Sequence, residues 1–151
     1  MHYVEPIIRP PSEADSIILQ VTTGCSHNKC TFCGVYKQKR FGIKPVETIE
    51  QDLSYAARHF GDTTRLFMCD GDVLIVPQPR LLAILERIHE KLPRVGRIAT
   101  YANAKSIGRK TDEELSQLHR AGVKVVHMGL ESGDDETLRR VNKYGDSAFI
   151  A

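Results

Sequence analysis

Three cysteines lie close together in the sequence and could hold a metal centre. Cys25, Cys30 and Cys33 have the spacing C-x4-C-x2-C. Thiols that cluster in this way in a reducing compartment favour a metal or redox site over disulfide bonds. Three thiolates on one loop can each bind one iron of a [4Fe–4S] cluster, which leaves the fourth iron open to a small molecule. The spacing therefore predicts an iron–sulfur site with a free coordination position.

Two other interpretations of the same loop remain open. Zinc could be bound in a Cys3His site by Cys25, His27, Cys30 and Cys33. Only one residue separates His27 from Cys25, however, and that crowds a tetrahedral site. The thiols could also carry no metal. The fourth cysteine, Cys69, could be a further ligand, but we expect it to be a small buried thiol of the core.

Apolar residues follow two periodicities that alternate along the chain. Short runs rich in β-branched residues predict buried strands over 17–23, 66–69, 95–101 and 123–130. Apolar positions spaced three or four apart predict helices over 46–60, 81–92, 111–121 and about 134–143. The third helix begins with the capping-box pattern Thr111-Asp112-Glu113-Glu114. Strict alternation of strands and helices implies parallel strands with helical crossovers, and so the α/β class.

Polar or glycine-containing segments follow all four predicted strands. They are residues 23–25, 70–72, 101–103 and 129–132. In a parallel sheet the carboxyl ends of the strands lie on one rim, and ligands bind there. We therefore expect a single site that combines the cysteine loop with these segments.

The cysteine loop resembles the signature loop of the radical S-adenosylmethionine (SAM) superfamily. In that superfamily three cysteines hold a [4Fe–4S] cluster, and an aromatic residue often precedes the third, as Phe32 does here. The usual spacing is C-x3-C-x2-C, so the first gap of this chain is one residue longer. The GLESG sequence of residues 129–133, followed by Asn142-Lys143, is similar to a GLESG…NK segment. Several branches share that segment, including the oxygen-independent coproporphyrinogen oxidase-like and tRNA-modifying groups.

The resemblance implies a set of cofactor contacts. Cys25, Cys30 and Cys33 would bind the irons, and residues 70–72 stand where the superfamily has a GGE-like motif for the SAM amino group. Besides the cysteines, the full set of implied cofactor-binding residues is Asp70, Gly71, Asp72, Asn103, Glu131, Ser132, Phe32 and Gly34. As alternatives, the aspartates could be ordinary turn residues and Ser132 a helix N-cap.

By this resemblance the chain is a radical SAM iron–sulfur enzyme. Such an oxidoreductase cleaves SAM reductively to a 5′-deoxyadenosyl radical, with an electron from flavodoxin or ferredoxin. The sequence indicates neither the substrate nor catalytic residues. The superfamily's barrel usually has six strand–helix units and about four are predicted here, so we expect a partial (β/α) barrel, the N-terminal part of the core. Two other functions stay open: an iron–sulfur electron-transfer or sensor module without SAM chemistry, and a zinc-stabilised binding module.

Three regions are expected along the chain: an extended lead-in over 1–15, the radical SAM core over 16–144 and a short tail over 145–151. The N-terminus lacks a basic segment followed by an apolar run. No apolar run approaches the ~20 residues of a membrane span. The predicted location is therefore the cytoplasm, with no membrane partner.

The charge distribution gives little reason to expect nucleic acid as a partner. The formal net charge is +2, which is too small to favour RNA or an anionic membrane. A basic stretch follows the cysteine loop and consists of Lys37, Lys39, Arg40 and Lys44. We expect it to be a solvated face, with RNA binding as the alternative. His127 is expected to be a packed histidine inside a strand.

Overall fold

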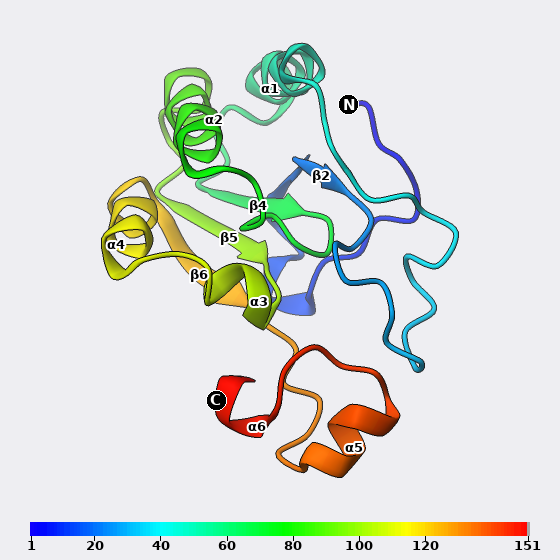
Figure 1. The fold of residues 1–151 in the computed structure, drawn as a ribbon. Coiled ribbons are helices and arrows are strands. Elements are labelled where there is room, and N and C mark those ends of the chain that lie inside the picture. The colour runs from blue at the N-terminus through cyan, green and yellow to red at the C-terminus, as the bar shows by residue number, and fades with distance from the viewer. Residues whose placement is uncertain (151) are drawn as a thin grey trace.

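The centre of the protein is a parallel sheet of four strands. The computed structural model describes residues 1–150. The strand order is β1 (Ile17–Gln20), β4 (Arg65–Cys69), β5 (Arg97–Tyr101) and β6 (Val123–His127). All three strand pairs are parallel, and each strand lies beside the next strand of this sheet in chain order (Figure 1). This arrangement is that of a β/α barrel, so the predicted α/β class and partial barrel are confirmed.

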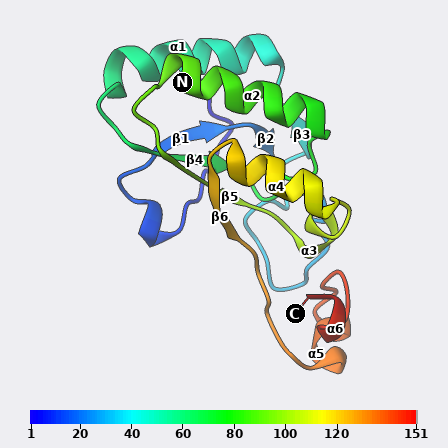
Figure 2. The same cartoon turned by 90° about the vertical axis from the view of Figure 1, so that its left-hand side faces the viewer.

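Three helices pack against one face of the sheet (Figure 2). They are α1 (Val46–Phe60), α2 (Gln78–Lys91) and α4 (Asp112–Arg120). The predicted capping box of α4 is confirmed, because the Thr111 hydroxyl accepts the Glu114 N–H and the Glu114 carboxylate accepts the Thr111 N–H. No helix within residues 1–150 is both long and apolar enough to cross a membrane.

Short elements lie at both ends of the strands. At the carboxyl ends they are β2 (Thr22–Thr23), β3 (Gly42–Ile43), α3 (Ala104–Ile107), α5 (Asp135–Arg140) and α6 (Ser147–Ile150), and η1 (Pro11–Glu13) lies at the amino ends. Strands β2 and β3 pair antiparallel, so the cysteine loop leaves and returns at one place. Helices α5 and α6 lie beyond the carboxyl end of β6 (Figure 1). Of these elements the sequence predicted only α5 as a separate unit.

The main core lies between the sheet and its three helices. Side chains of alternate strand residues point toward the helices. Four of these strand side chains are fully buried, namely Leu19, Leu66, Met68 and Ile98. The apolar stripes of α1 and α2 pack against them through Leu53 and Leu85, which are also fully buried. Burying each leucine contributes roughly 1.5–3 kcal/mol, so this layer holds the rim of the sheet in place.

The N-terminal lead-in covers the other face of the sheet. Phe67 and Cys69 are fully buried there, with Ile7 of the lead-in packed against their cluster. The Tyr3 hydroxyl donates a hydrogen bond to the carbonyl oxygen of Ile18 at 2.9 Å. Figure 2 shows η1 on the side of the sheet opposite the helices, whereas the chain begins beside α1, where the His2 N–H donates to Asp52. Cys69 is thus a buried core thiol, as expected, and burial raises its pKa.

A buried carboxylate fixes the lead-in to the amino ends of β4 and β5. Glu13 is fully buried and accepts hydrogen bonds from Arg97 at 2.8 Å and from the Ser16 hydroxyl at 2.6 Å. Arg65 lies 3.3 Å from the same carboxylate. Burial alone would raise the pKa of Glu13, but the hydrogen bonds and the two arginine charges lower it to about 2. The lead-in was predicted to be extended, and η1 is the departure that inserts this side chain.

Two predicted elements end earlier than their apolar pattern indicates. The strand predicted to reach residue 130 ends three residues short, because the chain leaves the sheet and Glu131 takes a φ of 66°. The helix predicted to reach residue 143 ends at Arg140. There Asn142 has a φ of 53°, and the N–H of Lys143 bonds to the carbonyl oxygen of Leu138 at 2.9 Å. Both turns direct this segment back toward the rim of the sheet.

Replacing Glu13 by Gln is expected to lower the free energy of unfolding at pH 7 by about 2 kcal/mol, as for other charged hydrogen bonds. A carboxyl group whose pKa falls on folding stabilises the protein above its unfolded value, and that stabilisation is lost as the pH falls through the folded value. The difference between wild type and variant should therefore shrink between pH 4.5 and about 2. Urea unfolding at several pH values measures this, and a constant difference would contradict it.

Candidate functional site

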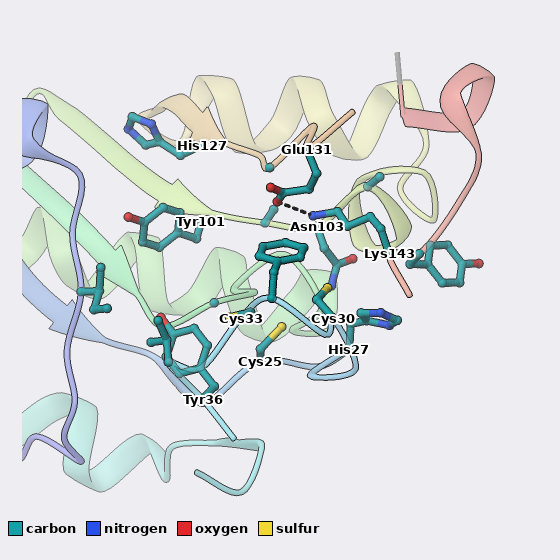
Figure 3. Close-up of a pocket in the computed structure, with 18 residues that line it drawn as sticks. Cys25, His27, Cys30, Cys33, Tyr36, Tyr101, Asn103, His127, Glu131 and Lys143 are labelled. Atoms are coloured by element: carbon teal, nitrogen blue, oxygen red, sulfur yellow. Dashed lines mark hydrogen bonds and ion pairs between the residues drawn. The ribbon is translucent and has the colours of Figure 1, made fainter. Parts of the chain in front are cut away.

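A pocket of about 270 Å³ lies at the carboxyl ends of the strands (Figure 3). Cys25, Cys30 and Cys33 all line it. Residues from the ends of β4 and β5 and from the segment after β6 complete its wall, among them Gly71, Asn103, Glu131 and Lys143. The structure thus brings the cysteine loop and the ends of three predicted strands into one site.

The three thiols are half-buried, and all of them line the pocket. Within residues 1–150, no group of three His, Cys, Asp or Glu side chains is arranged as the ligands of a single metal ion. The His27 Nε2 atom lies 2.7 Å from the carbonyl oxygen of Asn142, so this ring contacts the segment after α5.

Gly71 allows the cysteine loop to approach the end of β4. A Cβ atom at this position would lie 3.1 Å from the Cβ atom of Cys25 and 2.9 Å from the ring of Tyr36. The Gly71 N–H donates to the carbonyl oxygen of Gly24 at 3.1 Å. The contact between strand end and loop therefore requires a residue without a side chain.

Asp70 and Lys39 join the two ends of the cysteine loop behind the pocket. The Asp70 Oδ2 atom accepts the Gly24 N–H at 2.8 Å and the Gln20 side-chain amide at 3.0 Å. The Lys39 ammonium lies 2.5 Å from the same oxygen and donates to the carbonyl oxygen of Pro6 at 2.9 Å. Gly24 precedes the first cysteine and Lys39 follows the last, so one buried carboxylate closes the loop. We call this interaction the Asp70–Lys39 clasp.

Two lysines of the basic stretch correct the expectation of a solvated face. Lys39 and Lys44 are each only 5% exposed. The Lys44 ammonium lies 2.8 Å from Asp52 Oδ2, so each lysine neutralises one buried carboxylate. Lys37 and Arg40 are exposed, as predicted. Two of the four cations in this stretch are therefore buried in ion pairs and cannot contribute to an RNA-binding surface.

Asp72 ties the cysteine loop to the end of β5. Its buried carboxylate accepts hydrogen bonds from the hydroxyls of Ser26 and Ser106 and, at 2.8 Å, from the side-chain amide of Asn103. Asn103 also donates to the Ser26 hydroxyl at 2.8 Å. Burial raises the pKa of Asp72, because the hydrogen bonds from these three residues only partly offset the loss of solvent. The network fixes Asn103 at the pocket wall beside the loop.

The segment that carries GLESG and NK folds over the pocket as one unit. The Glu131 carboxylate lies 3.0 Å from the Lys143 ammonium, and both line the pocket (Figure 3). A side chain at Gly129 would overlap the Glu131 carboxylate and displace it from this position. The Thr31 N–H donates to the carbonyl oxygen of Val141 at 2.9 Å, which joins the segment to the cysteine loop.

Three rings form a wall of the pocket, and they belong to Tyr36, Tyr101 and His127. Tyr101 lies in the segment 101–103 that the sequence predicted at the site, whereas Tyr36 and His127 were not predicted there. Tyr101 and His127 are cross-strand partners with ring centroids 6.0 Å apart. His127 was expected to be packed, but it lines the pocket, with its Nε2 atom 3.6 Å from Glu13. The two-residue alternation of side chains along β5 and β6 could have indicated His127, because it puts Tyr101 and His127 on the face opposite the helices. Burial raises the pKa of both tyrosines, which keeps the hydroxyls protonated.

The predicted cofactor residues fall into three groups: residues that line the pocket, buried aspartates, and two residues outside both sets. Those that line the pocket are Phe32, Gly71, Asn103 and Glu131. Asp70 and Asp72 are fully buried and hold the loop from within the protein. The Ser132 hydroxyl accepts the Asp134 N–H at 3.0 Å, and Gly34 is exposed with open space around it. Only the first group is placed to contact a ligand directly.

Residues 19–150 match the sequence family described as the Radical SAM superfamily. The chain belongs to that superfamily. Among solved structures it is similar to OxsB, a cobalamin-dependent S-adenosylmethionine radical enzyme. Two OxsB structures, one with aqua-cobalamin and one with aqua-cobalamin and S-adenosylmethionine, give TM-scores of 0.59 and 0.61 at 25% and 24% identity. The FeFe-hydrogenase maturase HydG from Carboxydothermus hydrogenoformans gives 0.55 at 18% identity.

These similarities cover most of this chain but a minor part of its neighbours. The OxsB matches cover 87% and 89% of this chain and 20% and 21% of OxsB. The HydG match covers 90% of this chain and 32% of HydG. No curated protein matches the chain. The predicted superfamily is confirmed, and the branch within it stays a prediction.

Replacing Asp70 by Asn is expected to loosen the cysteine loop. The amide leaves the buried Lys39 ammonium without a counter-charge, and breaking such a pair typically costs about 3–5 kcal/mol. Hydrogen exchange followed by mass spectrometry should show faster exchange over residues 24–39, while α1, α2 and α4 keep their protection. Adding Lys39→Met removes the uncompensated charge, so the double variant should fold and still show a loose loop.

Asp52→Asn is the matched control for this prediction. It separates a second buried carboxylate from a lysine, Lys44, at a similar distance. It should destabilise the protein without raising exchange over residues 24–39. Unchanged loop exchange in the Asp70 variants, or an equal rise in the control, would show that the clasp does not hold the loop.

Proposed function

We propose that this chain binds a [4Fe–4S] cluster through Cys25, Cys30 and Cys33 and binds SAM in the adjoining pocket. The observation that carries the proposal is that the three thiols line the same pocket as the polar ends of parallel strands. Each thiol can bind one iron, which leaves the fourth iron free for SAM. Membership of the superfamily supports both cofactors, and one similar OxsB structure has S-adenosylmethionine bound.

Together the bound cofactors supply a 5′-deoxyadenosyl radical, because one electron passing through the cluster cleaves a sulfonium C–S bond of SAM and leaves methionine. The residues of this chain bind and orient. Asn103 and the Glu131–Lys143 pair present hydrogen-bonding groups of both charges, which suit the amino and carboxylate groups of SAM. Tyr101 and His127 offer two ring surfaces, inclined at 65° to each other, against which a substrate can pack.

Several finer assignments belong to the same proposal. The reaction is an oxidoreductase reaction in the cytoplasm, with flavodoxin or ferredoxin as the one-electron donor. The contact between Glu131 and Lys143 supports a branch with the GLESG…NK segment, because the two ends of that segment meet in the pocket. The substrate is left open, since the chain spans about a fifth to a third of its structural neighbours.

Replacing any one of Cys25, Cys30 and Cys33 by Ala should abolish cluster binding. Wild-type protein reconstituted anaerobically should be brown, contain about four irons per chain and release 5′-deoxyadenosine from SAM with dithionite. Each variant should lose the visible absorption and the product. Visible spectra, iron and zinc analysis and chromatography of the products measure these outcomes.

Cys69→Ala is the matched control, because Cys69 is buried in the sheet and does not line the pocket. It should keep the iron content and the product. Brown wild-type protein that leaves SAM intact would indicate an electron-transfer or sensor module instead. Colourless protein with one zinc per chain would indicate a zinc-stabilised module and overturn the proposal.

Glu131→Gln should weaken SAM binding to the reconstituted protein about tenfold, the usual effect of removing one charged hydrogen bond of about 1.5 kcal/mol. Glu136→Gln makes the same charge change on exposed α5 and should leave the affinity unaltered. Isothermal titration calorimetry with SAM compares the two variants. Equal affinities would show that Glu131 does not contact SAM.

A further inference from the structure

A second hollow beside the cysteine loop is lined by basic side chains. It measures about 140 Å³ and is bounded by Ser26, His27, Lys29, Ile75, Lys105 and Arg109. His27 is the only residue that it shares with the larger pocket, so the two hollows are separate. Lys29 and Arg109 are exposed. The Lys105 ammonium lies 4.8 Å from the ring centroid of Tyr144, which holds this cation at the edge of the hollow.

The positive charge of this hollow is not balanced within residues 1–150. Lys29, Lys105 and Arg109 form no ion pair with any carboxylate in that part of the chain. The carboxylate of Asp72 lies behind Ser26, but it is fully buried and bonded to Ser26. The net charge of the chain is only +2, so three unpaired cations in one place are a local feature. Such a feature attracts an anionic partner at long range.

The position of the hollow indicates what kind of partner it serves. Ser26, His27 and Lys29 belong to the segment between Cys25 and Cys30. A protein that docks here therefore contacts the segment that joins two of the proposed cluster ligands. A substrate, in contrast, must enter the larger pocket, which all three cysteines and the ring side chains line. A partner in the hollow thus lies against the cysteine loop and leaves the larger pocket free.

We propose that Lys29, Lys105 and Arg109 form the docking surface for an acidic electron-donor protein of the flavodoxin type. This inference rests on the proposed function, because it names the partner of the same cluster. Carboxylates of the donor would pair with the three cations and place its redox group beside the loop. One electron then passes to the cluster: the donor is oxidised by one electron and the cluster is reduced by one. Charged surfaces of this kind act mainly on association and on its salt dependence.

The test compares two triple variants with the same change of charge. The first is Lys29→Ala/Lys105→Ala/Arg109→Ala. The control is Arg58→Ala/Arg94→Ala/Lys124→Ala, whose exposed cations lie near the amino ends of the strands. Oxidised flavodoxin is titrated into each protein by calorimetry at about 0.02 M and about 0.2 M salt, where screening differs strongly. The first variant should lose at least tenfold in affinity at low salt, and the control should stay within about twofold.

Turnover separates this inference from the function on which it rests. Release of 5′-deoxyadenosine driven by dithionite, a small reductant that needs no docking, should be unchanged in the first variant. The same reaction driven by reduced flavodoxin should slow at least tenfold. Wild-type protein that binds flavodoxin through these residues but never cleaves SAM would refute the proposed function and leave the docking surface standing.

Three outcomes would overturn the docking surface. The first is flavodoxin affinity that is equal in wild type and in the first variant. The second is an equal loss of dithionite-driven turnover, because that would place these residues in the support of the loop itself. The third is wild-type protein that binds tRNA through these residues and shows no affinity for flavodoxin.

Discussion

The buried pair of Asp70 and Lys39 is the interaction on which the site depends. A loop that must hold three thiols has few apolar residues and cannot be fixed by a core of its own. The structure solves this with one carboxylate at the end of β4, which reaches both Gly24 at the start of the loop and Lys39 at its end. Removing two charges from water is costly, so such a pair contributes conformational specificity more than stability.

The rest of the architecture extends this single constraint to the whole rim. Asp72, two residues further along, holds Ser26 of the loop and Asn103, which follows β5, so the loop is joined to the ends of β4 and β5. The segment after β6 closes the other side through Glu131 and Lys143. The helices bury one face of the same strands, and the pocket lies at the carboxyl ends of these strands.

Much of the fold could be predicted from the sequence because its signals are local. The apolar periodicity of α1 and α2 and the capping box of α4 are set by residues a few positions apart, and each helix appears where expected. The cysteine spacing likewise indicated the site. What the sequence could not reveal depends on remote partners. Lys39 is buried because Asp70 neutralises it, and His127 reaches the pocket because the sheet pairs it with Tyr101.

The most direct test of the account is electron paramagnetic resonance of the reduced, reconstituted protein before and after addition of SAM. Under the proposed function the fourth iron of the cluster would have no protein ligand, and it would be free for SAM in the pocket that the three cysteines line together with Asn103 and Glu131. The proposed function therefore predicts the signal of a reduced [4Fe–4S] cluster whose shape changes when SAM binds that iron. A cluster signal that saturating SAM leaves unchanged would contradict it, because the open iron would then not face the SAM pocket.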